Sequence, residues 1–238
     1  MKNGVDIGSA HTLLAHGDLR AREALASKLE PVNLPVGSVL VAFGEETREA
    51  YFLQAGVASV IARSPKKKTS EIGIIGREGI IPALPALSRQ PSLFDVIMKI
   101  EGRGYQISVQ SLQEMVETLP SLRQLLDRFV EAFLVQSAYN AFAAVSHSPE
   151  ERVARCLLMC HDRMDGDEIP LTKKSLSAMA LADYDDVAEV LPRLEAQRLV
   201  RSTRNRVVVN NRAGLEVVAR DCYGRAEYAY RHLIGEFR

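Results

Sequence analysis

The segment Ile169–Val200, IPLTKKSLSAMALADYDDVAEVLPRLEAQRLV, constrains the fold of this chain more than any other stretch. Its apolar residues recur at helical spacing on both sides of a short break near Leu181. Thr172 stands where a helix N-cap is expected, because its hydroxyl can accept a hydrogen bond from a free N–H of the first turn. The spacing predicts one helix over residues 172–180 and a second over 183–197. Two short strands are expected over 199–209.

Two helices followed by an arginine-bearing hairpin are typical of a winged helix-turn-helix, which reads DNA with its second helix. The charge of the predicted second helix opposes that function. Before its first cation, Arg193, it carries four acids: Asp183, Asp185, Asp186 and Glu189. Carboxylates repel phosphates and cannot offer guanine the paired N–H donors of an arginine. Pro192 also removes one helix hydrogen bond and predicts a kink.

Cations gather beside this helix instead. Residues 198–212 contain no acid and five arginines: Arg198, Arg201, Arg204, Arg206 and Arg212. Such side chains can contact phosphates, which positions a protein on DNA without specifying sequence; solvated surface charge is the other interpretation. The residues expected at DNA are Thr172, Lys173, Lys174, Tyr184, Arg201, Arg204 and Arg206.

The N-terminal half has a different periodicity. Residues 13–30 have helical spacing, and short β-like runs follow at 39–43, 50–54, 58–62, 71–75, 94–100 and 105–109. Regular short strands separated by Gly, Pro and charged turns predict a sandwich or barrel. The run RSPKKK at 63–68 is expected to be a solvated hairpin tip, with a phosphate or membrane contact as the alternative.

A long helix is predicted between these regions, from Pro120 to Val145. Residues along one face of this helix are spaced alternately by four and three positions, as in a coiled coil, and we call this face the seam. We expect a parallel homodimer along this seam, although packing on the chain's own barrel can account for part of it. The expected interface residues are Leu122, Leu126, Phe129, Phe133, Gln136 and Asn140.

The composition indicates where in the cell the protein is expected and which kinds of site it is expected to lack. The chain has 238 residues, 30 basic and 30 acidic residues, and three cysteines. Sparse cysteines favour reduced thiols in a cytosol, and Cys156 and Cys160 are interpreted as small buried hydrophobes rather than metal ligands. No apolar run reaches the roughly 20 residues of a membrane span. We expect a cytoplasmic protein that is not an enzyme and has neither a metal site nor a cofactor.

The order of these parts resembles the Crp/Fnr family of bacterial transcription regulators, most clearly in YFLQAGVASV, IGIIGREG, RVARCLLMCHDR, DEIPLTKKSL and ARDCYG. The resemblance implies an α+β fold: a double-stranded β-helix (jelly-roll) sensor domain over residues 1–118, a dimerisation helix over 119–147 and a winged helix-turn-helix over 148–238. It implies a dimeric regulator whose sensor controls DNA binding. A sensor or interaction protein with DNA binding lost or dependent on a partner is the alternative. The implied partners are DNA, a second copy of the chain, an unknown small-molecule effector and RNA polymerase, but no membrane.

The resemblance also locates an effector site. Family members that bind cyclic nucleotides use a Gly-Glu start followed by an Arg-Ser or Arg-Thr pair. Residues 76–79 match the start, but Pro91–Ser92 occupies the place of the pair, and proline supplies neither charge nor N–H. The residues expected at an effector are therefore Glu78, Arg89 and Ser92, and no tight cyclic-nucleotide binding is expected. Leu181 falls where a turn glycine is usual.

Overall fold

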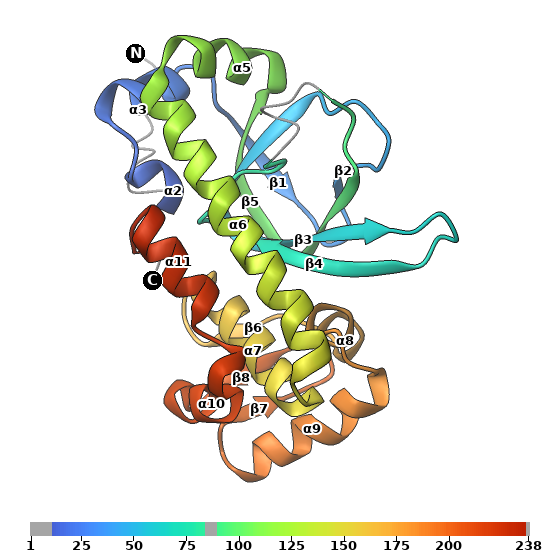
Figure 1. Cartoon of the computed structure of the whole chain (residues 1–238). Helices are drawn as coiled ribbons and strands as arrows, with labels where there is room; N and C mark the ends of the chain where they lie inside the picture. Colours follow the sequence, from blue (N-terminus) through green and yellow to red (C-terminus); the bar gives the residue numbers. More distant parts are fainter. Residues whose placement is uncertain (1–10, 84–89, 237–238) are drawn as a thin grey trace.

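A computed structural model describes residues 11–83 and 90–236 of the chain. A β-roll, a long helix that crosses it and a small helical C-terminal domain follow one another (Figure 1). The β-roll contains β1 (Glu30–Leu34), β2 (Val39–Val41), β3 (Glu49–Arg63), β4 (Thr69–Ile75) and β5 (Phe94–Ser108). These strands pair antiparallel in the order β1-β5-β3-β4, and β2 also pairs antiparallel with β5.

Two long strands replace four of the predicted short ones. The runs at 50–54 and 58–62 lie within β3, and those at 94–100 and 105–108 lie within β5, so the prediction of separate strands was wrong; Val109 begins the next helix. Register shifts surround Ala55, and Gly56 has φ +91°. Glycine allows this irregularity without ending the strand. A Cβ on Gly102 would lie 1.9 Å from the Ala55 carbonyl oxygen, so the two strands require glycine where they meet.

The segment before the sheet also differs from its prediction. Residues 13–30 form two helices, α2 (Thr12–Ala15) and α3 (Leu19–Ala26), and then enter β1. Asp18 begins α3 because its carboxylate accepts a 2.7 Å hydrogen bond from Ala21 N. The run at 63–68 forms the turn between β3 and β4, where Ser64 N donates to Lys68 O at 2.8 Å, which confirms the predicted hairpin tip.

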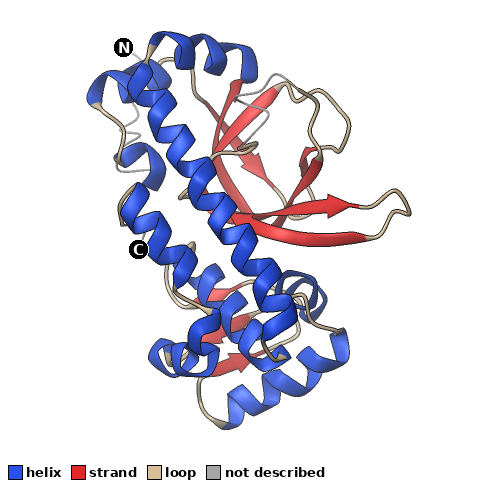
Figure 2. Ribbon diagram, viewed as in Figure 1, coloured by secondary structure: helices blue, strands red, loops and turns tan. Residues whose placement is uncertain are grey.

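Helix α6 (Pro120–Ser146) follows α5 (Val109–Thr118) and lies along the β-roll (Figure 2). Its N-terminal half completes the sheet's hydrophobic core with Leu122, Leu125, Leu126, Phe129 and Ala132. Among the described residues, no helix has both the length and the apolar character needed to cross a bilayer.

The C-terminal domain comprises α7 (Pro149–Asp162), β6 (Glu168–Ile169), α8 (Lys173–Ala180), α9 (Tyr184–Ala196), β7 (Val200–Ser202), β8 (Val207–Val209), α10 (Arg212–Ala219) and the 3-10 turn η1 (Arg220–Cys222). The predicted helix pair and hairpin are confirmed here. The core of this domain is continuous with the sheet, because Val57, Ile74 and Ile100 of the β-roll belong to it. The two domains therefore share buried apolar surface.

One further helix, α11 (Arg225–Leu233), follows η1. The sequence predicts a last helix over 213–224 followed by an aromatic tail; the helix forms but ends at Ala219, and the tail is itself helical, so the prediction of a tail without structure was wrong. The chain turns at Gly224, with φ +106°, and returns toward the β-roll beside α6 (Figure 1). Tyr230 is buried in the hydrophobic core of the β-roll, not in that of the C-terminal domain.

Candidate nucleic-acid interface and sensor cavity

The turn between α8 and α9 has the geometry of a helix-turn-helix. Thr172 caps α8 by accepting a 3.1 Å hydrogen bond from Ser175 N. Leu181 ends that helix in the left-handed conformation, at φ +52° and ψ +37°, as expected from its position. Arg152 of α7 donates a 2.5 Å hydrogen bond to the Leu181 carbonyl. This bond helps to hold a backbone conformation that costs a leucine about 1 kcal/mol or more.

The acids of α9 gather at its N-terminus. Asp183 is the N-cap, and its backbone N–H donates to Asp186 Oδ2 at 3.2 Å. Asp185 lies in the same first turn. Carboxylates here accept the free N–H groups and interact favourably with the helix dipole. The acids thus have a structural role that charge counting missed.

The exposed face of α9 has few side chains that can bind DNA phosphates or bases. Tyr184, Asp185, Glu189, Pro192 and Arg193 are exposed. Arg193 is the only cation of this helix, and its guanidinium binds Glu189 at 2.8 Å. Pro192 lies inside the helix, which continues to Ala196.

The hairpin β7–β8, which we call the wing (residues 200–209), exposes Arg201, Arg204 and Arg206. Arg206 forms a 2.8 Å ion pair with Glu168 of β6, and both side chains are about half exposed. Lys173 and Lys174 lie in the first turn of α8, and Lys174 is exposed. The wing therefore presents the cations that α9 does not.

Arg212 departs from the predicted arginine cluster. Its guanidinium turns inward, 2.8 Å from Asp162 Oδ1 and 2.7 Å from the Tyr223 hydroxyl. Burial lowers the pKa of Arg212, but the charges of Asp162 and Tyr223 and the hydrogen bonds to them together outweigh burial and raise that pKa. This arginine joins α10 to α7 and is not available to DNA in this conformation.

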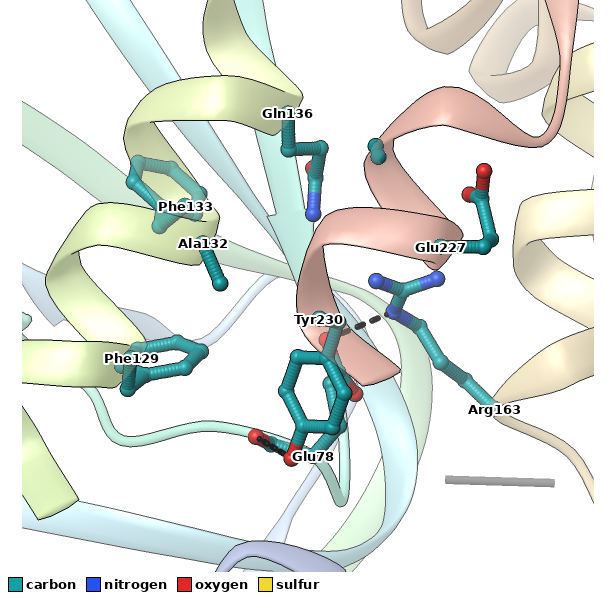
Figure 3. A pocket seen from close by; sticks show the side chains of 9 residues that line it. Glu78, Phe129, Ala132, Phe133, Gln136, Arg163, Glu227 and Tyr230 are labelled. Carbon is teal, nitrogen blue, oxygen red and sulfur yellow. Dashed lines mark hydrogen bonds and ion pairs between the residues drawn. The ribbon is translucent and has the colours of Figure 1, made fainter. Parts of the chain in front are cut away.

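The predicted effector residue Glu78 lies in a small cavity where the β-roll meets α6, α7 and α11. Its carboxylate accepts hydrogen bonds from Gly76 N at 3.1 Å and Arg163 Nε at 2.8 Å. Its backbone oxygen accepts a 2.8 Å hydrogen bond from the Tyr230 hydroxyl. Figure 3 shows Arg163 and Tyr230 converging on Glu78, with Phe129, Ala132, Phe133 and Gln136 of α6 opposite.

This cavity has a volume of about 10 Å³, which is room for about one water molecule. Ser92, the second predicted effector residue, does not line it. The Ser92 hydroxyl donates to Phe94 O at 2.8 Å and is buried. Arg89 lies outside the described residues. The predicted effector residues Glu78 and Ser92 thus share no cavity among those found in the described part of the chain.

The six predicted dimer residues require a correction. Leu122, Leu126 and Phe129 are buried in the core of the β-roll, and Phe133 is half-buried against it. Gln136 Oε1 accepts a 2.7 Å hydrogen bond from Ile74 N, and Asn140 Oδ1 accepts one from Arg155 of α7. The 4-3 spacing therefore marks the face of α6 that packs inside its own chain.

The cysteines behave as the sequence indicated. Cys156, Cys160 and Cys222 are buried and free. The contact with Cys160 and burial raise the pKa of the Cys156 thiol, and burial raises the pKa of Cys222 to about 11. Thiols held protonated in an apolar core are inert packing groups. Across residues 11–83 and 90–236, no group of three His, Cys, Asp or Glu side chains is arranged to hold a metal ion.

Comparison with known proteins agrees with this architecture. The family profile described as cyclic nucleotide-binding domain matches residues 31–118, and the Crp-like helix-turn-helix domain matches residues 151–218. A search of curated proteins gave no match.

Similar solved structures include FixK2 from Bradyrhizobium japonicum, with 13% identity, a TM-score of 0.69 and coverage of 81% of this chain and 98% of that one. The c-di-GMP-responsive regulator CLP from Xanthomonas campestris has 16% identity, a TM-score of 0.63 and coverage of 81% and 99%. A Crp/Fnr regulator from Eubacterium rectale has 10% identity, a TM-score of 0.66 and coverage of 90% and 100%. With both domains matched in this order, the chain belongs to the Crp/Fnr family of transcription regulators, with an N-terminal sensor domain and a C-terminal DNA-binding domain.

Proposed function

We propose that this regulator binds DNA chiefly through phosphate contacts of its wing, and not through base contacts of α9. The observation that carries the proposal is the separation of charge between neighbouring elements. The wing exposes Arg201 and Arg204, whereas the exposed face of α9 carries Asp185 and a Glu189–Arg193 ion pair. Phosphate contacts dominate affinity and carry little sequence information.

The test is a salt titration of DNA binding with the purified protein, by fluorescence anisotropy on fragments enriched by genomic SELEX. Wing contacts release counterions, so affinity should fall steeply with salt. Arg204→Ala should lower the slope of log K against log salt by about one on every sequence. Arg20→Ala, an exposed arginine of α3, is the matched control and should leave the slope unchanged. Absence of binding even at low salt would favour the alternative, a sensor or interaction protein that has lost DNA binding.

We also propose that the protein is a parallel homodimer through the outer face of α6. Its C-terminal half exposes Leu134, Ala138, Ala141 and Val145, again spaced by four, three and four residues. Leu134 is 67% and Val145 85% exposed, and Phe142 beside them is 50% exposed. An apolar row of this kind on a long helix is stabilised by a second helix. A second copy of this chain supplies a matching row.

The family leads us to expect a small-molecule effector, contact with RNA polymerase and a cytoplasmic location. The buried, unpaired cysteines agree with a reducing compartment. The small cavity at Glu78 argues against a cyclic nucleotide in this conformation, because its volume of about 10 Å³ leaves room for about one water molecule.

A further inference from the structure

Helix α11 fastens the C-terminal domain to the sensor. It follows η1 of the C-terminal domain, yet Tyr230 is 5% exposed within the core of the β-roll, and Leu233 and Ile234 pack against the same core. Beyond them, the Glu236 carbonyl oxygen lies 3.0 Å from His16 Nε2, next to α2. We call residues 225–236 the strap.

The strap and the C-terminal domain meet at one sensor residue. Arg163 at the end of α7 binds the Glu78 carboxylate, and Tyr230 of the strap binds the Glu78 carbonyl oxygen. Arg163 is 3% and Glu78 2% exposed. Removing one partner of a buried ion pair leaves an uncompensated charge, so the pair resists separation while the strap covers it.

The domains also meet at a surface ion pair and at a buried apolar contact. Arg77 Nη1 lies 2.6 Å from Asp165 Oδ1, and Asp165 is 86% exposed, so screening by solvent weakens this pair. Val57, Ile74 and Ile100 contribute apolar contact. The strap is a second covalent connection between the domains, after the one from α6 to α7, because its first residues follow η1 and its later residues complete the sensor core.

From this geometry we infer that the strap is an internal lock. It packs between α6 and the loop at Glu78, and it fixes the C-terminal domain in one orientation on the sensor. When the strap is seated, the cavity beneath it is about 10 Å³ and the Glu78–Arg163 pair is closed. When the strap leaves, Arg163, Phe129 and Phe133 lose the helix that covers them, and the C-terminal domain is free to rotate. This lock does not depend on how the protein contacts DNA.

The first test measures distances between the domains by electron–electron resonance. Nitroxides are placed on Lys67→Cys, in the turn between β3 and β4, and Ala196→Cys, at the end of α9; the native cysteines are buried. Dilution with unlabelled protein removes distances between subunits. The intact chain should give one narrow distribution, and a chain that stops after Gly224 should give a broad one. A folded truncated chain with an unchanged narrow distribution would show that the strap is not the lock.

The second test applies whether or not the truncated chain folds. Tyr230→Phe keeps the ring and removes only the hydroxyl that donates to Glu78. Tyr228→Phe is the matched control, because Tyr228 lies on the same helix and is exposed. Hydrogen exchange should become about five-fold faster in α11 and at residues 76–79 in Tyr230→Phe, the effect of one net hydrogen bond. The control should leave both unchanged. Equal exchange in the two variants would overturn the lock.

Discussion

At the scale of single residues, the acids of α9 differ in what they do. Asp186 accepts a hydrogen bond from the N-cap N–H and stabilises the helix start. Asp185 lies one position earlier, is exposed and faces away from the domain core. Substitution at these two neighbours should therefore have different effects, one on stability and one on DNA.

Asp185→Ser should strengthen DNA binding on all sequences, because it removes repulsion of phosphates without adding a base reader. Asp186→Ser should lower stability by about 0.5–1 kcal/mol through the lost cap. Anisotropy and urea unfolding measure the two effects. The interpretation fails if Asp185→Ser abolishes recognition of one strong operator, because the carboxylate would then be accepting from a cytosine amino group.

Glu227 is a buried carboxyl close to Asp162, and burial followed by that repulsion raises its pKa above the ordinary 4.5, despite attraction by Arg155 and Arg163. A raised pKa in the folded state means that the ionised form weakens folding above pH 4.5 and that the penalty disappears below it. Its carboxylate also accepts a 2.9 Å hydrogen bond from Gly224 N. Glutamine keeps an acceptor oxygen for this bond.

Glu227→Gln should raise Tm at pH 7 to 8, by about 2–4 °C for each kcal/mol gained, and the gain should shrink as pH falls toward 4.5. Differential scanning calorimetry between pH 5 and 8 measures it against wild type. Glu23→Gln, on the exposed side of α3, is the control. A gain that is constant with pH would exclude ionisation of Glu227 as its cause.

At the scale of elements, α6 has two apolar faces with different partners. One face packs on the β-roll, α7 and α11, and the other is exposed. A glutamate on the inner face would be buried without a partner. A glutamate on the outer face would be buried only in the dimer, against the second copy of the chain, and would leave the fold of each copy intact.

Leu134→Glu with Val145→Glu should give a folded monomer, and Phe129→Glu should unfold the sensor instead. Sedimentation velocity at micromolar concentration gives the mass, and near-UV circular dichroism reports on packing. A wild-type protein that already sediments as a monomer would refute the dimer.

The elements differ in how far the sequence predicts them. Thr172 and the wing were predicted because caps and turns are local signals, whereas the resemblance to the family located Leu181 at the turn. The 4-3 spacing of α6 indicated a buried face but not what buries it, since either a second copy or the β-roll satisfies the same pattern. The strap was missed although Ala226, Tyr230 and Leu233 follow i, i+4, i+7 spacing. Its partners lie far away along the chain, so no local signal could identify them.

At the scale of the whole molecule, sensor, long helix, C-terminal domain and strap share buried contacts, so no part is isolated from the others. The strap covers the cavity at Glu78, because Tyr230 lines it and binds the Glu78 carbonyl oxygen. Any effector that enters there must displace Tyr230 and open the Glu78–Arg163 pair, so weak binding is expected even from a ligand of suitable shape.

Cyclic AMP and cyclic GMP should therefore not bind tightly to the full chain. Isothermal titration calorimetry measures this directly. A dissociation constant in the low micromolar range, about −8 kcal/mol, would contradict the prediction and show that residues other than the Pro91–Ser92 pair neutralise the phosphate.

The position of Tyr230 also affects how the protein is made. Ribosomes release the β-roll first, and N-terminal domains generally fold as they emerge. Here the sensor core gains Tyr230 only after the C-terminal domain has been synthesised, since its bond to Glu78 spans 152 positions. The nascent sensor thus lacks one aromatic side chain of its own core until the last residues of the chain have been synthesised.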